Sequence, residues 1–188
     1  MKTVRVVLQE SVSEADIDSA AWDNEWSLVK TIKGDENTPH EVIYRTEDEQ
    51  AFIHYIEDFY IDMAYLVVRS DEPEKAIEEI CSYLPIYDKG EIFEMLKKAT
   101  KPEEFIQGIY YAGLISPQQY DAEFFELFKQ VLSNQDPGVR LAVITAIGYA
   151  GWPEFKEILE SLIITDSDPE VRQDAEDMLE GLKLHVLN

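Results

Sequence analysis

The chain has 188 residues, of which 39 are acidic and 16 basic, so its formal net charge is −23. Hydrophobic residues make up 45% of the sequence and aromatic residues 11%, which is enough for a packed core and excludes a disordered chain. The negative charge argues against nucleic acid and anionic membranes as ligands, because both require a cationic surface, and it favours a basic protein partner. The alternative is that the charge only confers solubility.

The sequence shows no signal for secretion or membrane insertion. No apolar run reaches transmembrane length, and Arg5 interrupts the short apolar run at the N-terminus. The single cysteine, Cys81, excludes an internal disulfide and a cysteine-based zinc site. Because Cys81 lies at helical spacing from Ile77 and Leu84, we expect its thiol to be buried. We therefore expect a soluble, cytoplasmic protein.

Residues 1–85 are predicted to form an α/β region. The segment Ser11–Asn24 is too polar for a strand and predicts a loop or a short helix. The sequence Ser70-Asp71-Glu72-Pro73 predicts one helix, roughly Glu74–Leu84, because an acceptor side chain precedes a proline suited to a first turn. Runs rich in β-branched and aromatic residues predict strands at Thr3–Gln9, Ser27–Lys33, His40–Thr46, Ala51–Glu57 and Ile61–Arg69. These elements predict a small, mostly antiparallel sheet carrying one helix.

Residues 86–188 are predicted to be helical, because the hydrophobic period changes there from two to about 3.6. A longer repeat is also present. The motif Asp136-Pro137-Gly138-Val139-Arg140 recurs 32 residues later as Asp168-Pro169-Glu170-Val171-Arg172, and the apolar positions around each copy recur with it. A fainter copy precedes them, with Lys101-Pro102 and no arginine. A period of this length predicts two to three stacked helical hairpins.

The motif Asp-Pro-x-Val-Arg at the start of a hairpin's second helix resembles the HEAT-repeat family, over about residues 90–183. The resemblance implies a right-handed stack of two to three hairpins, which together with the predicted N-terminal sheet gives an α+β fold. It also implies that Asp136 and Asp168 cap the second helices, while Arg140 and Arg172 tie neighbouring repeats together. Helix-capping chemistry favours the same role for the aspartates, because their oxygens can accept hydrogen bonds from free amides.

The two repeated second helices differ outside their shared apolar positions. The helix that begins at Pro137 is apolar nearly all round, so we expect other elements to cover it on several sides. The helix that begins at Pro169 carries many charges, as a solvated end cap of the stack requires. Because the other end of the stack also needs a cover, we expect the N-terminal sheet to pack there and form one body with the helices.

The second helices of such stacks commonly line one concave face, which is the usual docking surface. Tyrosine and tryptophan are favoured at interfaces because they bury a large area and keep a polar group, and acidic residues would extend that face for a basic partner. The predicted partner-binding residues are Tyr110, Tyr111, Tyr149, Trp152, Asp174 and Asp177. The alternative is that each ring belongs to the core, with Trp152 joining two hairpins.

Catalytic chemistry has weaker support. His40-Glu41 is similar to the His-Glu pairs from which one group of HEAT-like proteins builds a di-iron hydroxylase, but only one such pair occurs, and His54 and His185 lack matching glutamates. Asp58 and Asp62 flank an aromatic turn, where they are either acid–base groups or solvated loop charges. We therefore predict no catalytic residue, no metal and no cofactor.

These observations favour a non-enzymatic protein–protein interaction module, of which an acidic immunity or inhibitor protein with a cationic partner would be an example. One alternative is an enzyme or cofactor-binding protein with its site in the N-terminal sheet and the repeats as scaffold. Another is self-association through the repeats.

Overall fold

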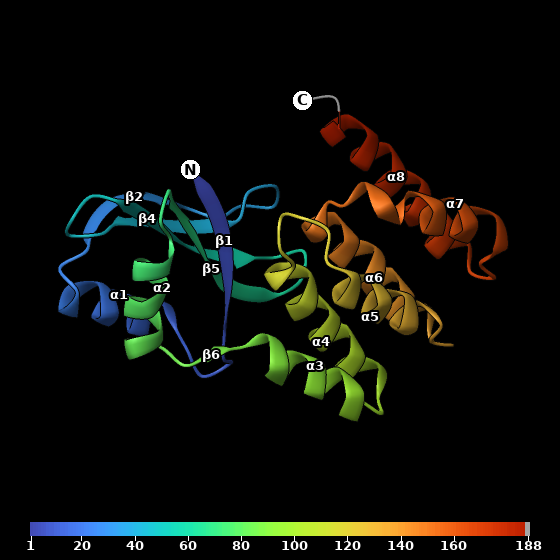
Figure 1. Ribbon diagram of the computed structural model, residues 1–188, viewed down its shortest axis with the longest axis horizontal. Coiled ribbons are helices and arrows are strands. Elements are labelled where there is room, and N and C mark those ends of the chain that lie inside the picture. The colour runs from blue at the N-terminus through green and yellow to red at the C-terminus, as the bar shows by residue number, and fades with distance from the viewer. Residues whose placement is uncertain (187–188) are drawn as a thin grey trace. The chain divides into compact units, whose positions relative to one another are not determined.

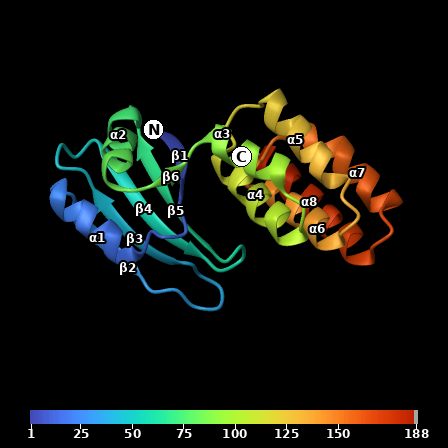
Figure 2. The ribbon, with the colours of Figure 1, turned by 90° about the horizontal axis from the view of Figure 1, so that it is seen from below.

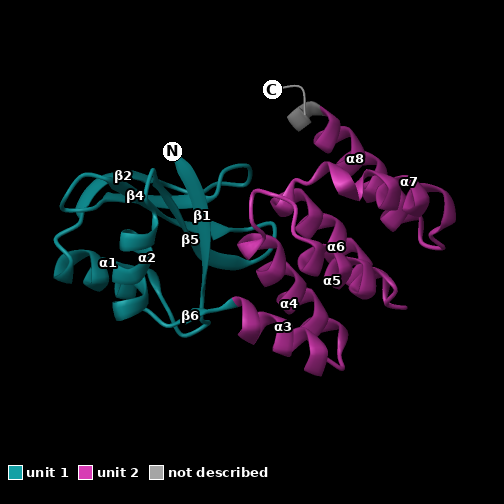
Figure 3. Cartoon of the chain, in the orientation of Figure 1, with its two compact units in different colours: residues 1–88 teal, residues 89–188 magenta. Residues whose placement is uncertain are grey.

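The computed structural model of the chain contains two compact units, residues 1–88 (unit 1) and residues 89–188 (unit 2), which Figure 3 shows in different colours. It describes the backbone of residues 1–186 and the side chains of residues 1–183, so the side chain of His185 lies outside the described residues. None of the helices among the described residues combines the length and the hydropathy that a membrane-spanning helix requires. That the two units pack together as one body stays a prediction.

Unit 1, which Figure 1 shows with its sheet, contains a six-stranded antiparallel sheet, and its strand order is β2-β3-β4-β5-β1-β6. The strands are β1 (Lys2–Leu8), β2 (Ser27–Ile32), β3 (His40–Arg45), β4 (Ala51–Asp58), β5 (Met63–Ser70) and β6 (Ile86–Tyr87). The five predicted strands are confirmed. β5 begins two residues later than predicted, because Asp62 adopts a φ of 52° and ends the preceding turn. The sequence did not predict β6, since two residues are too few to show an alternating pattern.

Two helices cover one face of this sheet (Figure 1). Helix α2 (Glu74–Tyr83) forms where the sequence predicts it. The polar segment before β2 contains a true helix, α1 (Glu14–Asp23), which a capping box between Ser13 and Asp16 begins. Side chains at alternate strand positions, including Ile53 and Leu66, pack with helix residues such as Ile80 to form the core.

The prediction of a buried Cys81 is wrong, because the thiol is exposed. Helix α2 turns Ala76 and Ile80 toward the sheet. Cys81 follows Ile80 by one residue and therefore points about 100° away from it around the helix.

Unit 2 is a stack of three helical hairpins, which follow one another along the chain from green to red in Figure 2. Each hairpin has a first and a second helix, and the second helices α4, α6 and α8 lie side by side. The helices are α3 (Lys89–Lys98), α4 (Pro102–Ile115), α5 (Ala122–Leu132), α6 (Pro137–Ala150), α7 (Lys156–Thr165) and α8 (Pro169–Val186), with a 3₁₀ turn at Pro153–Phe155 before α7. The predicted stack is confirmed, and the faint first copy is a real hairpin.

Helix α6 occupies the centre of unit 2 and is buried on several sides, as its composition predicts. Its close contact with α4 depends on Gly113. A Cβ atom on Gly113 would lie 2.8 Å from the Cβ of Ala146 and 2.9 Å from its Cα. At the end of the stack, α8 exposes Glu170, Glu176 and Glu180, in agreement with the predicted polar cap.

Candidate functional site

The second helices of unit 2 form the surface on which the sequence places the binding residues. Asp136 begins α6 by accepting hydrogen bonds from the backbone amides two and three residues later, at 2.8 and 3.4 Å. Asp168 begins α8 in the same way, at 2.9 and 3.4 Å. In α4 the carboxylate of Glu104 instead reaches back to the amide of Lys101, at 3.2 Å. The predicted aspartate caps are therefore confirmed, whereas the first hairpin has only the reverse bond of a capping box, from a side chain in the first turn back to the N-cap amide.

Arg140 ties the second hairpin (α5 and α6) to the third (α7 and α8). Its Nε donates to Asp166 Oδ2 at 2.8 Å and its Nη2 donates to Oδ1 at 2.7 Å, while Nη1 donates to the carbonyls of Asn134 and Gln135. The Arg140 and Asp166 side chains are only 10% and 5% exposed. The hydrogen bonds from Arg140 lower the pKa of the Asp166 carboxyl, so the pair is ionised at neutral pH. The tying role that the family resemblance implies is confirmed for Arg140.

Tyr110 on α4 and Tyr149 on α6 are both half-buried. The Tyr110 hydroxyl forms a hydrogen bond with the side chain of Thr145 on α6, and burial raises the pKa of Tyr110, so the hydroxyl stays neutral. Thr145 is not among the residues predicted from the sequence. Its signal there is a single threonine in the middle of a helix that is mostly apolar.

Tyr111 and Trp152 belong to the core, which corrects their prediction as contact residues. They are 4% and 2% exposed, respectively. The Trp152 Nε1 donates to the carbonyl of Pro117 at 2.9 Å, and its ring stacks on Phe155 with an interplanar angle of 1°. Trp152 thus joins the turn after α6 to the turn after α4, which is the alternative role that its position predicts. Tyr111 follows Tyr110 by one residue and therefore points about 100° away from it around α4, into the core.

Asp174 and Asp177 lie on α8, one helical turn apart. Asp174 is half-buried and Asp177 is exposed. Burial and the charge of Asp177 raise the pKa of Asp174. Asp177 accepts a hydrogen bond from Gln173 at 3.0 Å, which holds its carboxylate on the helix surface.

We call the accessible part of these second helices the second-helix surface, which consists of Tyr110, Thr145, Tyr149, Asp174 and Asp177. It crosses all three hairpins, because α6 packs against both α4 and α8. The α6 helix carries no acidic residue, whereas α8 carries five up to Glu180. The surface is therefore neutral and aromatic over α4 and α6 and negatively charged over α8.

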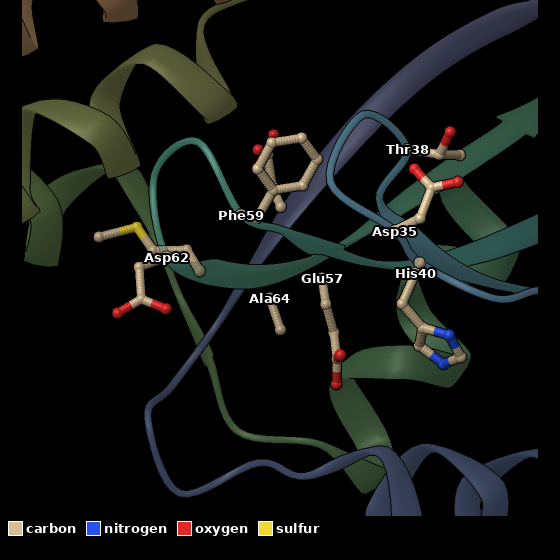
Figure 4. Close-up of a pocket in the computed structure, with 10 residues that line it drawn as sticks. Asp35, Thr38, His40, Glu57, Phe59, Asp62 and Ala64 are labelled. Atoms are coloured by element: carbon tan, nitrogen blue, oxygen red, sulfur yellow. The ribbon is translucent and has the colours of Figure 1, made fainter.

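Unit 1 has a cavity of about 410 Å³ at one end of its sheet. Glu57 and Ala64 are paired residues of β4 and β5 that line it, and Asp35 and His40 come from the loop before β3 and the start of that strand. Figure 4 shows that the side chains of Asp35, Glu57 and Asp62 point in different directions and do not converge on one position. Within the described residues, no group of three or more His, Cys, Asp or Glu side chains could hold a metal ion.

Asp58 at this cavity has a structural role. Its side chain is buried, accepts a hydrogen bond from the amide of Tyr60 at 3.0 Å, and accepts another from the Tyr65 hydroxyl at 3.3 Å. Burial, together with the Asp58 charge, raises the pKa of Tyr65 to about 12. Asp58 thus stabilises the turn between β4 and β5, which neither alternative from the sequence describes. Asp62 is exposed.

His40 and His54 in unit 1 each lie close to a glutamate that is distant in the sequence. His54 on β4 has its Nδ1 2.6 Å from Glu41 Oε1 on the neighbouring strand, so the prediction that His54 lacks a matching glutamate is wrong. His40 has its Nε2 3.4 Å from the carboxylate of Glu14 on α1. The adjacent residues His40 and Glu41 therefore belong to two separate pairs.

Comparison with known proteins agrees with the architecture of unit 2. The family model for HEAT repeats matches residues 93–180. No curated protein and no solved structure matches the chain.

Proposed function

Since residues 93–180 match the family model for HEAT repeats, we propose that this chain is a non-enzymatic binding module whose second-helix surface holds a basic protein. HEAT repeats are generally scaffolds for protein interactions and are typically non-enzymatic. The observation that carries the proposal is that half-buried tyrosines on α4 and α6 and the carboxylates of α8 lie on neighbouring second helices.

The two parts of this surface have different roles in the proposed complex. The carboxylates of Asp174 and Asp177, within a chain of net charge −23, attract a cationic partner and accelerate its association. Tyr110 and Tyr149 contribute apolar area with little loss of side-chain entropy, because they are already half-buried, and so they lengthen the life of the complex. An acidic immunity or inhibitor protein that neutralises a cationic toxin or nuclease is the class that this chemistry fits.

The test begins with capture of partners by the immobilised full-length chain from an extract of its own organism. The captured protein is then purified, and its association and dissociation rates are measured at several salt concentrations. Recovery of a basic protein whose association slows as salt rises supports the proposal. Recovery of acidic proteins only, or of no protein, contradicts it.

A pair of matched variants locates the surface. The double variant Asp174→Lys/Asp177→Lys reverses two carboxylates on α8, and Glu123→Lys/Glu126→Lys reverses two with the same spacing on the first helix α5. Both change the net charge equally, and all four side chains except the half-buried Asp174 are exposed. We expect the α8 variant to slow association about tenfold at low salt and the α5 variant to change it far less. Equal effects of the two variants would show that only the total charge matters.

A further inference from the structure

Arg172 in the third hairpin occupies the position that Arg140 occupies in the second. Its Nη1 donates to the carbonyl of Asp166 at 2.7 Å, just as the Nη1 of Arg140 donates to the carbonyl of Asn134 at 3.0 Å. In Arg140, the Nε and Nη2 groups hold the carboxylate of the following hairpin. Among the described residues, the Nε and Nη2 groups of Arg172 have no hydrogen-bond partner.

This part of the guanidinium group is shaped for a carboxylate. Nε and Nη2 present two parallel N–H donors, a geometry that matches the two oxygens of a carboxylate group. Arg172 is half-buried, and its bond to the Asp166 carbonyl fixes the orientation of the group. A preoriented donor pair loses less side-chain entropy on binding than a free arginine side chain would.

The surface around Arg172 differs from the corresponding surface inside the stack. Ile144 on α6 is 2% exposed, and the equivalent position on α8 is the exposed Glu176. Gly148 on α6 corresponds in the same way to the exposed Glu180. Arg172, Glu176 and Glu180 are spaced four residues apart and therefore follow one side of α8.

An exposed apolar side chain lies close to the segment that Arg172 contacts. Ile164, in the last turn of α7, is 81% exposed and precedes by two residues the Asp166 carbonyl that Arg172 contacts. An isoleucine that is this exposed on a helix costs solubility and gives no packing, so its area is available for a partner.

We propose that the outer end of the third hairpin, formed by Ile164, Arg172, Glu176 and Glu180 and called here the terminal surface, binds a helical segment of a partner protein. The segment places a carboxylate on Arg172, basic side chains opposite Glu176 and Glu180, and an apolar side chain on Ile164. The inference rests on the proposed protein-binding function and assigns it a second surface.

Charge excludes a second copy of this chain as the occupant. In a symmetric contact between two copies, α8 would face α8. The acidic residues of this helix up to Lys183 are Glu170, Asp174, Glu176, Asp177 and Glu180, whereas its basic residues are Arg172 and Lys183. Facing carboxylates repel each other when water is excluded between them. The partner is therefore a different protein with basic residues on the docking helix.

The test uses as probe a fourth hairpin attached to the full chain. The attached hairpin repeats residues 154–183 and follows Asn188 through a flexible linker, which gives it an effective concentration in the millimolar range. It keeps Asp166 as the carboxylate for Arg172. Within the stack, Met178 on α8 lies against Gly148 on α6. Because Glu180 corresponds to Gly148, a docked copy would bring its own residue 178 against Glu180. The attached hairpin therefore carries Met178→Lys.

Docking is measured by nuclear magnetic resonance with ¹⁵N label in the attached hairpin only. An isolated hairpin of this length is unfolded in water, so folded amide signals report the docked state. We expect Arg172→Ala in the resident hairpin and Asp166→Ala in the attached one each to reduce the docking constant at least tenfold. Because both remove the same bond, we expect the double variant to lose little more than either single variant. The matched control is Lys183→Ala, which removes a basic side chain elsewhere on α8 and should leave docking unchanged.

Two further variants test the paired donors of Arg172 and the charge opposite Glu180. Arg172→Lys keeps the charge but loses the paired donors, so docking should weaken nearly as much as in Arg172→Ala. Met178→Glu in the attached hairpin faces Glu180 with a like charge and should weaken docking as well. An undocked hairpin, or docking that is insensitive to Arg172 while circular dichroism shows the resident helices intact, would overturn the proposal. The test needs no cellular partner, so its failure is distinct from failure of the proposed function.

Discussion

Replacement of Gly113 by alanine is expected to destabilise unit 2, whereas the same replacement of Gly148 is expected to stabilise it. Both glycines lie inside helices at contacts between second helices, α4 with α6 and α6 with α8. A new Cβ atom at Gly113 would meet the Cβ, Cα and O atoms of Ala146 at 2.8, 2.9 and 3.1 Å. A new Cβ atom at Gly148 would meet the Cε and Sδ atoms of Met178 at 2.9 and 3.3 Å.

The expected changes in stability depend on whether the atoms that a new Cβ atom would meet can move away. Carbon atoms in contact prefer a separation of about 3.5–4.0 Å. At Gly113 the obstacle is partly backbone, so two packed helices must separate, and such overpacking costs about 1–3 kcal/mol. Alanine recovers about 1 kcal/mol of helix propensity relative to glycine. At Gly148 the obstacle is the flexible end of Met178, which can change rotamer, so most of that gain remains. We expect the two variants to differ by about 1–3 kcal/mol.

Urea unfolding followed by circular dichroism at 222 nm gives the free energy of each variant. Gly181→Ala on α8 is the reference for helix propensity, because a Cβ atom there meets no atom within 4 Å. The expected order of stability is Gly181→Ala, then Gly148→Ala, then wild type, then Gly113→Ala. If Gly113→Ala is as stable as Gly148→Ala, the close contact of α4 with α6 is not what the structure shows.

Three further predictions concern single side chains. Asp166→Asn should lower the free energy of unfolding by about 3 kcal/mol at pH 7, since it leaves Arg140 buried without its counter-ion. Because the native pKa of Asp166 is lowered, this difference from wild type in urea unfolding should shrink as the pH falls below about 4. Trp152→Phe should lose about 1 kcal/mol with its indole hydrogen bond, whereas Trp22→Phe at an exposed site should leave the unfolding midpoint unchanged. The exposed thiol of Cys81 should react with a thiol reagent in the native protein nearly as fast as in urea, and slow native reaction would contradict its exposure.

The repeat made most of unit 2 predictable from the sequence. Asp136 and Asp168 recur with a proline at the first helical position, and this local chemistry decides where a helix begins whatever surrounds it. The strands of unit 1 were predictable for a similar reason, because alternation is a local signal. Cys81 and β6 were not, since the exposed side of a short helix and a two-residue strand both depend on the neighbouring elements.

The candidate site was only partly predictable, because the burial of a ring depends on distant residues. Trp152 receives its hydrogen bond partner from Pro117, which is 35 residues away. Similarly, the pairing of His54 with Glu41 arises from the register of β3 and β4, where His54 pairs with Ile43, two residues from Glu41 on the same face of the sheet. No property of the separate segments specifies these contacts.

The second-helix surface is negatively charged at its α8 end and neutral over α4 and α6. Steering by carboxylates acts over a Debye length, about 8 Å at physiological ionic strength, so Asp174 and Asp177 influence mainly what approaches α8. Over α4 and α6 the surface presents Tyr110, Thr145 and Tyr149, whose contribution is insensitive to salt. A partner that is basic at one end of its contact area and apolar at the other can therefore bind in one orientation only. Reversing the charges on α8 should then change chiefly the association rate, and truncating the tyrosines chiefly the dissociation rate.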